Sequence, residues 1–188
     1  MTTVEPQSPE LVPGNLAVGI RLWAAATTFV FFCPFFAYFY LRSLDSAGLW
    51  RPAGVDPPQA FGVAIVALSV LSAAALLLAS RREVSAWLPL TALSLVLGLI
   101  AVVLQCVEYA RLGFGPTDGG YASVFVAWTA LNALVVLGTM LWLETLLAYG
   151  LRSPDPLPLV RPRLEALAFY WAYLAALAAV MWVVLYLA

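Results

Sequence analysis

The chain has 188 residues, of which 64% are hydrophobic and only 10% are charged, and its formal net charge is −1. This composition is typical of an integral membrane protein and excludes a soluble domain with a single core. The near-neutral charge provides no basic surface for nucleic acid. Histidine is absent, which removes the side chain on which haem, copper and zinc sites in membrane helices most depend.

Five apolar stretches are long enough, at about 20 residues or more, to cross a hydrocarbon core of roughly 30 Å. The predicted fold is therefore all-α, a bundle of five transmembrane helices. The spans are predicted over residues 17–41, 60–80, 86–110, 121–149 and 164–187 of a membrane domain that covers 17–188. Residues 1–16 are rich in proline and are predicted to form an extended tail.

The distribution of arginines predicts how these spans are oriented. With five spans the two termini lie on opposite sides, and six arginines fall on the side of the N-terminus against three on the other. Cytoplasmic loops carry the excess of basic residues, so we expect the N-terminus in the cytoplasm and the C-terminus outside. Six aromatic residues near span ends are predicted to lie at the membrane interface: Trp23, Trp50, Trp87, Tyr121, Tyr149 and Tyr186.

The third span carries the most informative polar residues. Gly98, Gln105, Glu108 and Tyr109 fall on one stripe of a helix. Lipid offers neither the amide nor the carboxylate a partner, so this stripe is predicted to be a docking face against protein. Arg111 lies three residues after Glu108, and an ion pair between them at the membrane edge is one predicted partnership. A neighbouring helix or a polar group of a partner protein is the alternative partner for Glu108.

Other candidate groups give weaker signals. Thr129 and Asn132 in the fourth span are buried polar residues that we expect at helix contacts. Met140 and Met181 are isolated on their helices, where methionine usually fills core space, so we expect no redox centre in this chain. A small transporter is an alternative of another class. It needs a polar path at mid-membrane, whereas the deep polar residues here are only threonine and asparagine.

Several motifs together resemble subunit III of the haem–copper oxidases, the cytochrome c oxidase subunit III family, in its short bacterial form with five spans. The third span is similar to the family pattern Gly-x-x-x-x-x-x-Gln-x-x-Glu-Tyr. The stretch from Gly120 to Gly138, with Thr129 and Asn132 inside it, is similar to Gly-Tyr-Gly-Ser-x-Phe-x-x-x-Thr-Gly-Phe-His-Gly-Leu-His-Val-x-Gly. Further matches follow the family's order: Phe36–Arg42, Trp50-Arg51-Pro52, Glu165 and Tyr170-Trp171.

The chain departs from the family where the family has titratable groups. Asn132 and Val135 stand at the positions of two family histidines, and Thr27 stands close to that of an acid. The family sequence Trp-His-Phe-Val-Asp corresponds to residues 171–175, Trp-Ala-Tyr-Leu-Ala. These substitutions put a proton-collecting role in doubt and leave structural roles intact.

The resemblance implies an accessory subunit without cofactors, while haem and copper reside in the partner catalytic subunit. Subunit I is the expected direct partner, with subunit II and a small subunit IV in the same complex, phospholipids bound, and the bacterial cytoplasmic membrane as location. An accessory protein of a nitric oxide reductase is the alternative within the superfamily. The residues predicted to be structural or at interfaces are Gly98, Gln105, Glu108, Tyr109, Arg111, Thr129, Asn132, Gly138, Tyr170 and Trp171.

Overall fold

The computed structural model describes residues 11–45, 48–81, 84–152 and 157–187. Within them, five long helices are followed by one turn of π-helix: α1 Leu11–Ser43, α2 Gln59–Arg81, α3 Val84–Arg111, α4 Gly120–Arg152, α5 Leu157–Trp182 and η1 Val183–Leu187. All five helices are long and apolar enough to cross a membrane. A helix satisfies its own backbone hydrogen bonds, which lipid cannot do, so the uninterrupted apolar runs fold in this way. The all-α fold with five spans is thus confirmed.

The helix bounds differ from the predicted spans mainly at two ends. α1 begins at Leu11, so residues 11–16, which we expected in an extended tail, are helical. The rest of that tail lies outside the described residues. α5 begins at Leu157, seven residues before the predicted start at residue 164. In both cases the helix continues past the apolar stretch, because its first turn needs no hydrophobic surroundings to form its hydrogen bonds.

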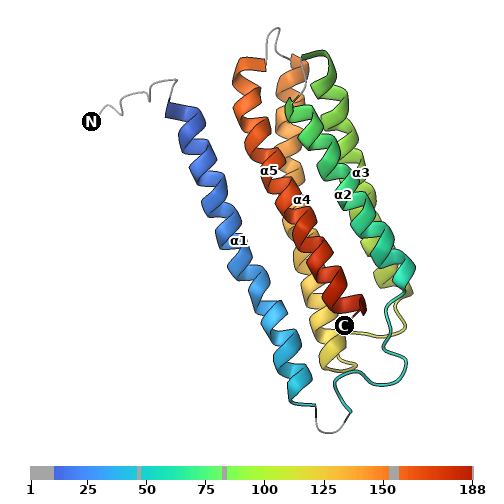
Figure 1. The fold of residues 1–188 in the computed structure, drawn as a ribbon. Helices are drawn as coiled ribbons and strands as arrows, with labels where there is room; N and C mark the ends of the chain where they lie inside the picture. The colour runs from blue at the N-terminus through green and yellow to red at the C-terminus, as the bar shows by residue number, and fades with distance from the viewer. Residues whose placement is uncertain (1–10, 46–47, 82–83, 153–156, 188) are drawn as a thin grey trace, which may run out of the picture.

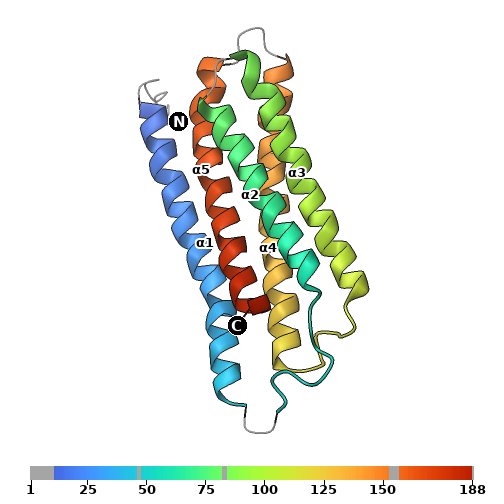
Figure 2. The same cartoon turned by 45° about the vertical axis from the view of Figure 1, so that its right-hand side comes forward.

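The helices run up and down, so each lies antiparallel to the one before it (Figure 1). α2 and α3 lie side by side, α4 and α5 occupy the middle, and α1 lies at the edge of the bundle beside α5 (Figures 1 and 2). The start of α1 and Leu187 are at opposite ends of the bundle (Figure 1). We call the end that holds Leu187, together with the starts of α2 and α4, the C-terminal end of the bundle.

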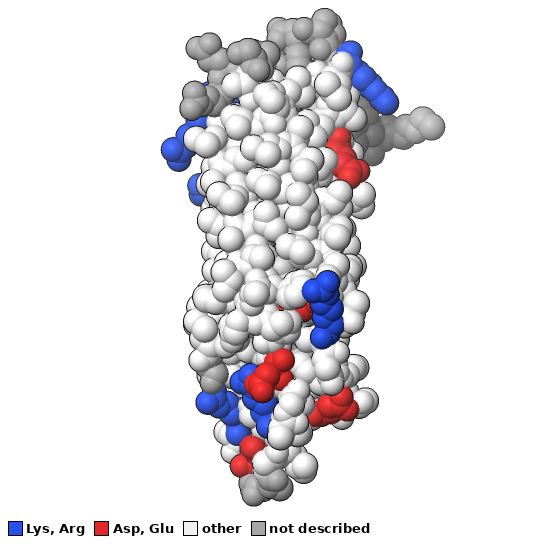
Figure 3. All heavy atoms as spheres, turned by 90° about the vertical axis from the view of Figure 1, so that its right-hand side faces the viewer, with Lys and Arg blue, Asp and Glu red and all other residues white. Residues whose placement is uncertain are grey.

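Charged side chains avoid the middle of the molecule. On the face formed largely by α2 and α3, they gather near the two ends and leave a wide uncharged band between them (Figure 3). This pattern is what a membrane-spanning bundle requires, because charged groups in the hydrocarbon region are costly.

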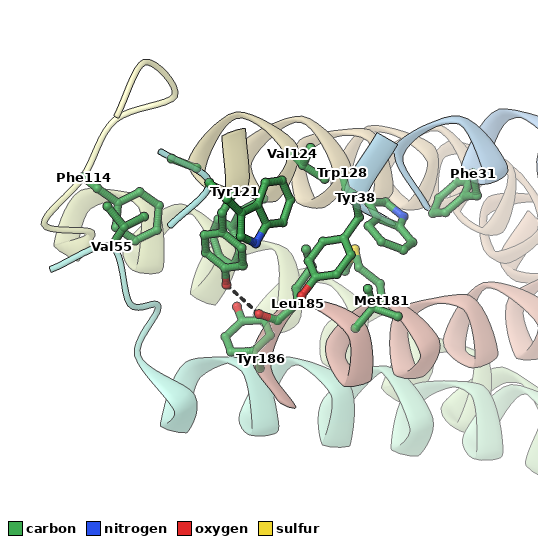
Figure 4. Close-up of a cluster of buried hydrophobic side chains, with 14 residues drawn as sticks. Phe31, Tyr38, Val55, Phe114, Tyr121, Val124, Trp128, Met181, Leu185 and Tyr186 are labelled. Carbon is green, nitrogen blue, oxygen red and sulfur yellow. Dashed lines mark hydrogen bonds between the residues drawn. The ribbon is translucent and has the colours of Figure 1, made fainter. Parts of the chain in front are cut away.

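A cluster of aromatic side chains forms the core at the C-terminal end (Figure 4). Phe125, Tyr121 and Trp128 of α4 are buried there with Tyr38 of α1 and Tyr186 of η1. Most of their rings meet edge to face, as between Phe125 and Tyr186 at 5.5 Å and between Tyr38 and Tyr121 at 6.4 Å. This geometry is favoured by the ring quadrupoles. The cluster therefore joins α1, α4 and the last turn of the chain.

The segment from Trp50 to Asp56 covers this end of the bundle. Trp50 packs its ring edge-on against Tyr121 at 5.9 Å, and its carbonyl accepts a hydrogen bond from the Tyr121 amide at 2.8 Å. Gly119 makes the close approach possible. It has φ of +130°, a conformation that L side chains rarely adopt, and a Cβ there would lie 2.8 Å from Pro52 Cδ.

The six aromatic residues predicted at the membrane interface differ in burial. The side chains of Trp23 and Tyr149 are exposed, and their position at the interface stays a prediction. The other four, Trp50, Trp87, Tyr121 and Tyr186, are buried within the protein, each 9% exposed or less. A position near a span end does not fix which side of the helix a ring faces, and here these rings fill the space between helix ends.

Candidate functional site: a buried carboxylate network

Glu108 lies at the centre of a polar network buried at the C-terminal end. Its side chain has no exposed surface. Gln105 Nε2, one turn earlier in α3, donates to Glu108 Oε2 at 2.6 Å, and the Tyr186 hydroxyl donates to Glu108 Oε1 at 2.6 Å. A buried carboxyl group is costly unless its oxygens have hydrogen-bond partners, and these two donors give each oxygen one. The network thus joins α3 to the last turn of the chain.

The ion pair predicted between Glu108 and Arg111 is wrong. Within the described part of the chain the ion pairs are Arg51–Asp56 and Arg161–Glu165, and Arg111 is exposed with its guanidinium 5.6 Å from the centre of the Phe61 ring. Three residues turn a helix by about 300°, and here that rotation places Glu108 inside the bundle and Arg111 outside it. Both carboxylate oxygens are instead satisfied by neutral donors.

Two further side chains hold the same turn of η1. The Tyr121 hydroxyl donates to the Leu185 carbonyl at 2.5 Å, and Gln59 Nε2 donates to the Tyr186 carbonyl at 2.6 Å. The last carbonyls of a helix have no partner within it, and lipid provides none. Donors from α2 and α4 therefore cap a helix end that α3 already holds through Glu108. Gly62 adds a close contact, since a Cβ there would lie 2.6 Å from Tyr186 Cε1.

Tyr109 reaches a different helix from its neighbour Glu108. Its hydroxyl lies 2.6 Å from Thr129 Oγ1 of α4, and Thr129 Oγ1 also donates to the Phe125 carbonyl at 2.7 Å. Successive residues on α3 thus contact η1 and α4. The stripe of α3 faces other helices of this same chain.

Gly98 and Trp171, which lie far apart in the sequence, form a second contact. A Cβ at Gly98 would lie 2.9 Å from Trp171 Cζ2. The Trp171 indole is held in place because its Nε1 donates to Ser72 Oγ at 2.8 Å, and Ser72 Oγ donates to the Ser94 carbonyl at 2.6 Å. The glycine therefore admits a tryptophan of α5 between α2 and α3.

The remaining predicted residues differ in their surroundings. The Tyr170 hydroxyl lies 2.8 Å from Thr27 Oγ1, so it joins α5 to α1. Asn132 is buried, and its Oδ1 has no hydrogen-bond partner. A Cβ at Gly138 would meet nothing within 4 Å, and this glycine borders a groove between α1, α4 and α5. Its position in the motif is not explained by a close contact in this chain.

Sequence reasoning missed the partners that come from other elements. Tyr186, Gln59 and Ser72 were not predicted to take part in any site, although all three are polar groups in or beside apolar spans. A polar side chain in an apolar span indicates that it needs a hydrogen-bond partner. Spacing along one helix cannot show which residue of another helix is that partner.

Chemically, the site is a set of satisfied hydrogen bonds. In the described ranges no three His, Cys, Asp or Glu side chains lie close enough to hold a metal ion. Glu108 is enclosed by its donors and has no surface open to a substrate. The arrangement can fix helix positions.

Comparison with known proteins identifies the family. Residues 2–188 match the model of the family described as Cytochrome c oxidase subunit III. The chain belongs to this family. The resemblance stated from the motifs is confirmed, and with it the accessory subunit III role that the motifs imply.

Several relatives carry the same description. Cytochrome c oxidase subunit 3 of Ornithorhynchus anatinus is 28% identical over 98% of this chain and 72% of its own length. The protein of Latimeria chalumnae is 31% identical over 93% of this chain and 69% of its own length. The protein of Mus musculus is 29% identical over 98% of this chain and 72% of its own length. The similarity thus covers nearly the whole chain at low identity.

Proposed function

We propose that this chain is the accessory subunit III of a haem–copper oxidase, which stabilises the catalytic subunit and has no redox centre of its own. The observation that carries the proposal is the family match over residues 2–188. The geometry supports it, because the Glu108 carboxyl group is buried and the hydroxyls of Tyr186 and Tyr109 form hydrogen bonds that join α3 to η1 and α4.

Subunit I is the direct partner in this proposal, with subunit II and a small subunit IV in the same complex. Haem and copper belong to the catalytic subunit. The exposed side of α1 offers an apolar surface for a neighbouring subunit or lipid: Phe29 is 77% exposed, and Phe32 and Phe36 follow it on the helix. Exposed aromatic side chains in a membrane helix pack against either one.

Phospholipid is the second proposed partner. A groove of about 350 Å³ lies between α1, α4 and α5, lined by Trp23, Gly138 and Trp142 among others. Near the N-terminal end of α1, a second hollow of about 200 Å³ is lined by Arg21 and Glu165. A guanidinium at this depth matches the phosphate of a lipid headgroup, and the apolar groove matches an acyl chain.

An accessory protein of a nitric oxide reductase is the second candidate. The observation that favours it is the replacement of titratable family residues by Thr27, Asn132 and Val135. In the structure Thr27 is used to bind Tyr170, so its position has a structural role here.

The orientation and the location are also proposals. We infer from the excess of arginine on the N-terminal side that the N-terminus is cytoplasmic. The bacterial cytoplasmic membrane is proposed from the resemblance to the short bacterial form of the family. The test uses a chain in which Cys33 and Cys106, both exposed, are replaced by alanine. A thiol reagent that cannot cross membranes, added outside, should label Asp118→Cys and spare Leu151→Cys. The opposite pattern contradicts the orientation.

The function is tested by purifying the complex through a tag on this chain in mild detergent and recording its optical spectrum. We expect haem and copper in fixed proportion to this chain, and consumption of oxygen that depends on an electron donor. Reduction of nitric oxide without oxygen consumption would assign the chain to the reductase instead. A protein that purifies without haem would contradict both assignments.

A further inference from the structure

A small cavity lies between α2, α3 and α4, one helical turn from the Glu108 network. Its volume is about 20 Å³, and Ser69, Gln105, Asn132 and Val136 are among the residues that line it. A cavity needs roughly 10–15 Å³ of such volume to hold one water molecule. The space therefore fits a single water.

Asn132 has an unpaired polar atom that calls for a ligand in this cavity. The residue is only 6% exposed, and its Oδ1 has no hydrogen-bond partner. Among the buried side-chain atoms without a partner in the described segments, this is the one oxygen, and the others are indole nitrogens. An amide oxygen left unpaired in an apolar interior is unfavourable, and buried polar atoms of native proteins are almost always paired with protein or water.

The neighbouring side chains provide further partners. Ser69 Oγ donates to the Ile65 carbonyl at 2.8 Å, so its lone pairs remain able to accept. Gln105 uses its Nε2 to donate to Glu108, and the same amide carries a second N–H and a carbonyl oxygen. A buried water typically makes about three hydrogen bonds, and these groups provide that number.

We propose that this cavity binds one structural water, which donates to Asn132 Oδ1 and bonds to Ser69 or the Gln105 amide. The water extends the Glu108 network from α3 to the middle of α4 and closes the one open acceptor among the described residues of the bundle core. The ligand is neutral, because no charged side chain is among the described residues that line the cavity.

A second cavity provides an internal comparison. It also measures about 20 Å³ and lies beside Gly98 and Trp171, with Ser69 and Val136 in the wall that both cavities share. Its other hydroxyl, Ser72 Oγ, already accepts from Trp171 and donates to Ser94. With that hydroxyl satisfied and apolar side chains around it, this cavity should stay dry.

The direct test is a cryo-electron microscopy map of the whole complex at a resolution that shows ordered water. We expect density within hydrogen-bond distance of Asn132 Oδ1 and none beside Gly98. An empty Asn132 cavity would overturn the proposal, and so would an Asn132 side chain that bonds directly to a protein group.

A pair of variants provides an independent test by the sign of a shift. Asn132→Leu expels the water and leaves Ser69 and Gln105 without it, so the thermal midpoint for loss of this subunit from the complex should fall. If the native cavity holds no water, Asn132→Leu only removes an unsatisfied acceptor, and the thermal midpoint should stay unchanged or rise. Val136→Ile fills the same space and keeps the acceptor, so loss of the water leaves Asn132 Oδ1 unpaired and the midpoint should fall in this variant as well. An unchanged or higher midpoint in both variants would contradict the proposal.

Discussion

The first helix and the last described turn are attached to the bundle in different ways. At the C-terminal end, η1 is held by side chains from α2, α3 and α4, through the bonds to Glu108, the Leu185 carbonyl and the Tyr186 carbonyl. α1 is joined to α5 by two threonine–tyrosine bonds, Thr27–Tyr170 and Thr28–Tyr173. Both attachments are polar. Only the attachment of η1 depends on a group without an alternative partner, which is Glu108.

The difference lies in what each side chain does when its partner is lost. Thr27 and Thr28 also donate to carbonyls of their own helix, Trp23 at 2.9 Å and Ala24 at 2.9 Å, so they stay satisfied without the tyrosines. Glu108 has no described cation paired with it and no exposed surface, so its donors and its oxygens depend on each other. A side-chain hydrogen bond to η1 therefore has a different energetic value from one between α1 and α5.

The largest effect is expected from Glu108→Leu. The substitution leaves the Gln105 amide and the Tyr186 hydroxyl without an acceptor, and each unpaired donor costs about 1–3 kcal/mol. The thermal midpoint of this subunit in the purified complex should fall markedly. Glu144→Leu is the matched control, since Glu144 is an exposed acid of α4. Equal stability of the two variants would show that the Glu108 network contributes nothing to the fold.

The next effect is expected from Gly98→Ala. The new methyl group lies 2.9 Å from a Trp171 ring that is tethered to Ser72, so α3 or α5 must shift, at a cost of about 1–3 kcal/mol. Gly138→Ala is the control, because its Cβ meets nothing within 4 Å. That variant should be neutral or gain about 0.5–1 kcal/mol, since alanine favours the helix. If Gly98→Ala proved as stable as Gly138→Ala, the Gly98–Trp171 contact would not be the reason for the glycine.

A smaller effect is expected from Tyr186→Phe. This variant keeps the ring in the aromatic cluster and leaves one oxygen of Glu108 unpaired, so the loss should be about 1 kcal/mol, the low end for one unpaired buried group. Gln105 still donates to the carboxylate. The measurement is the temperature at which this chain is released from the complex, compared between the variant and the native protein. A loss as large as that of Glu108→Leu would mean that Tyr186 alone holds the network together.

The smallest effect is expected at the α1 attachment. Tyr173→Phe removes the bond to Thr28, whose hydroxyl keeps its bond to the Ala24 carbonyl, so the change should stay below about 0.5 kcal/mol. Tyr186→Phe serves as its comparison at the η1 attachment. A greater loss for Tyr173→Phe would reverse the ranking of the two attachments.

The sequence predicts the fold well because each span is a local feature. Length and hydropathy place all five helices, and helical spacing places Gly98, Gln105, Glu108 and Tyr109 on one face. It predicts poorly what that face meets. The partners Tyr186, Thr129 and Trp171 come from other helices, and their positions depend on packing that no spacing along α3 specifies. The Glu108–Arg111 pair is wrong for the same reason, because Glu108 bonds to Tyr186, which is distant in sequence, while Arg111 faces outward.

The central claim is that Glu108 supports structure and takes no part in oxidase chemistry. The most direct test is to purify complexes that carry Glu108→Leu through a tag on this chain, and to measure both the amount of catalytic subunit recovered and the turnover per catalytic haem. We predict less recovered complex, with turnover per haem close to that of the native complex. Normal recovery with turnover lower by orders of magnitude would contradict the claim and place Glu108 in the chemistry or in proton transfer.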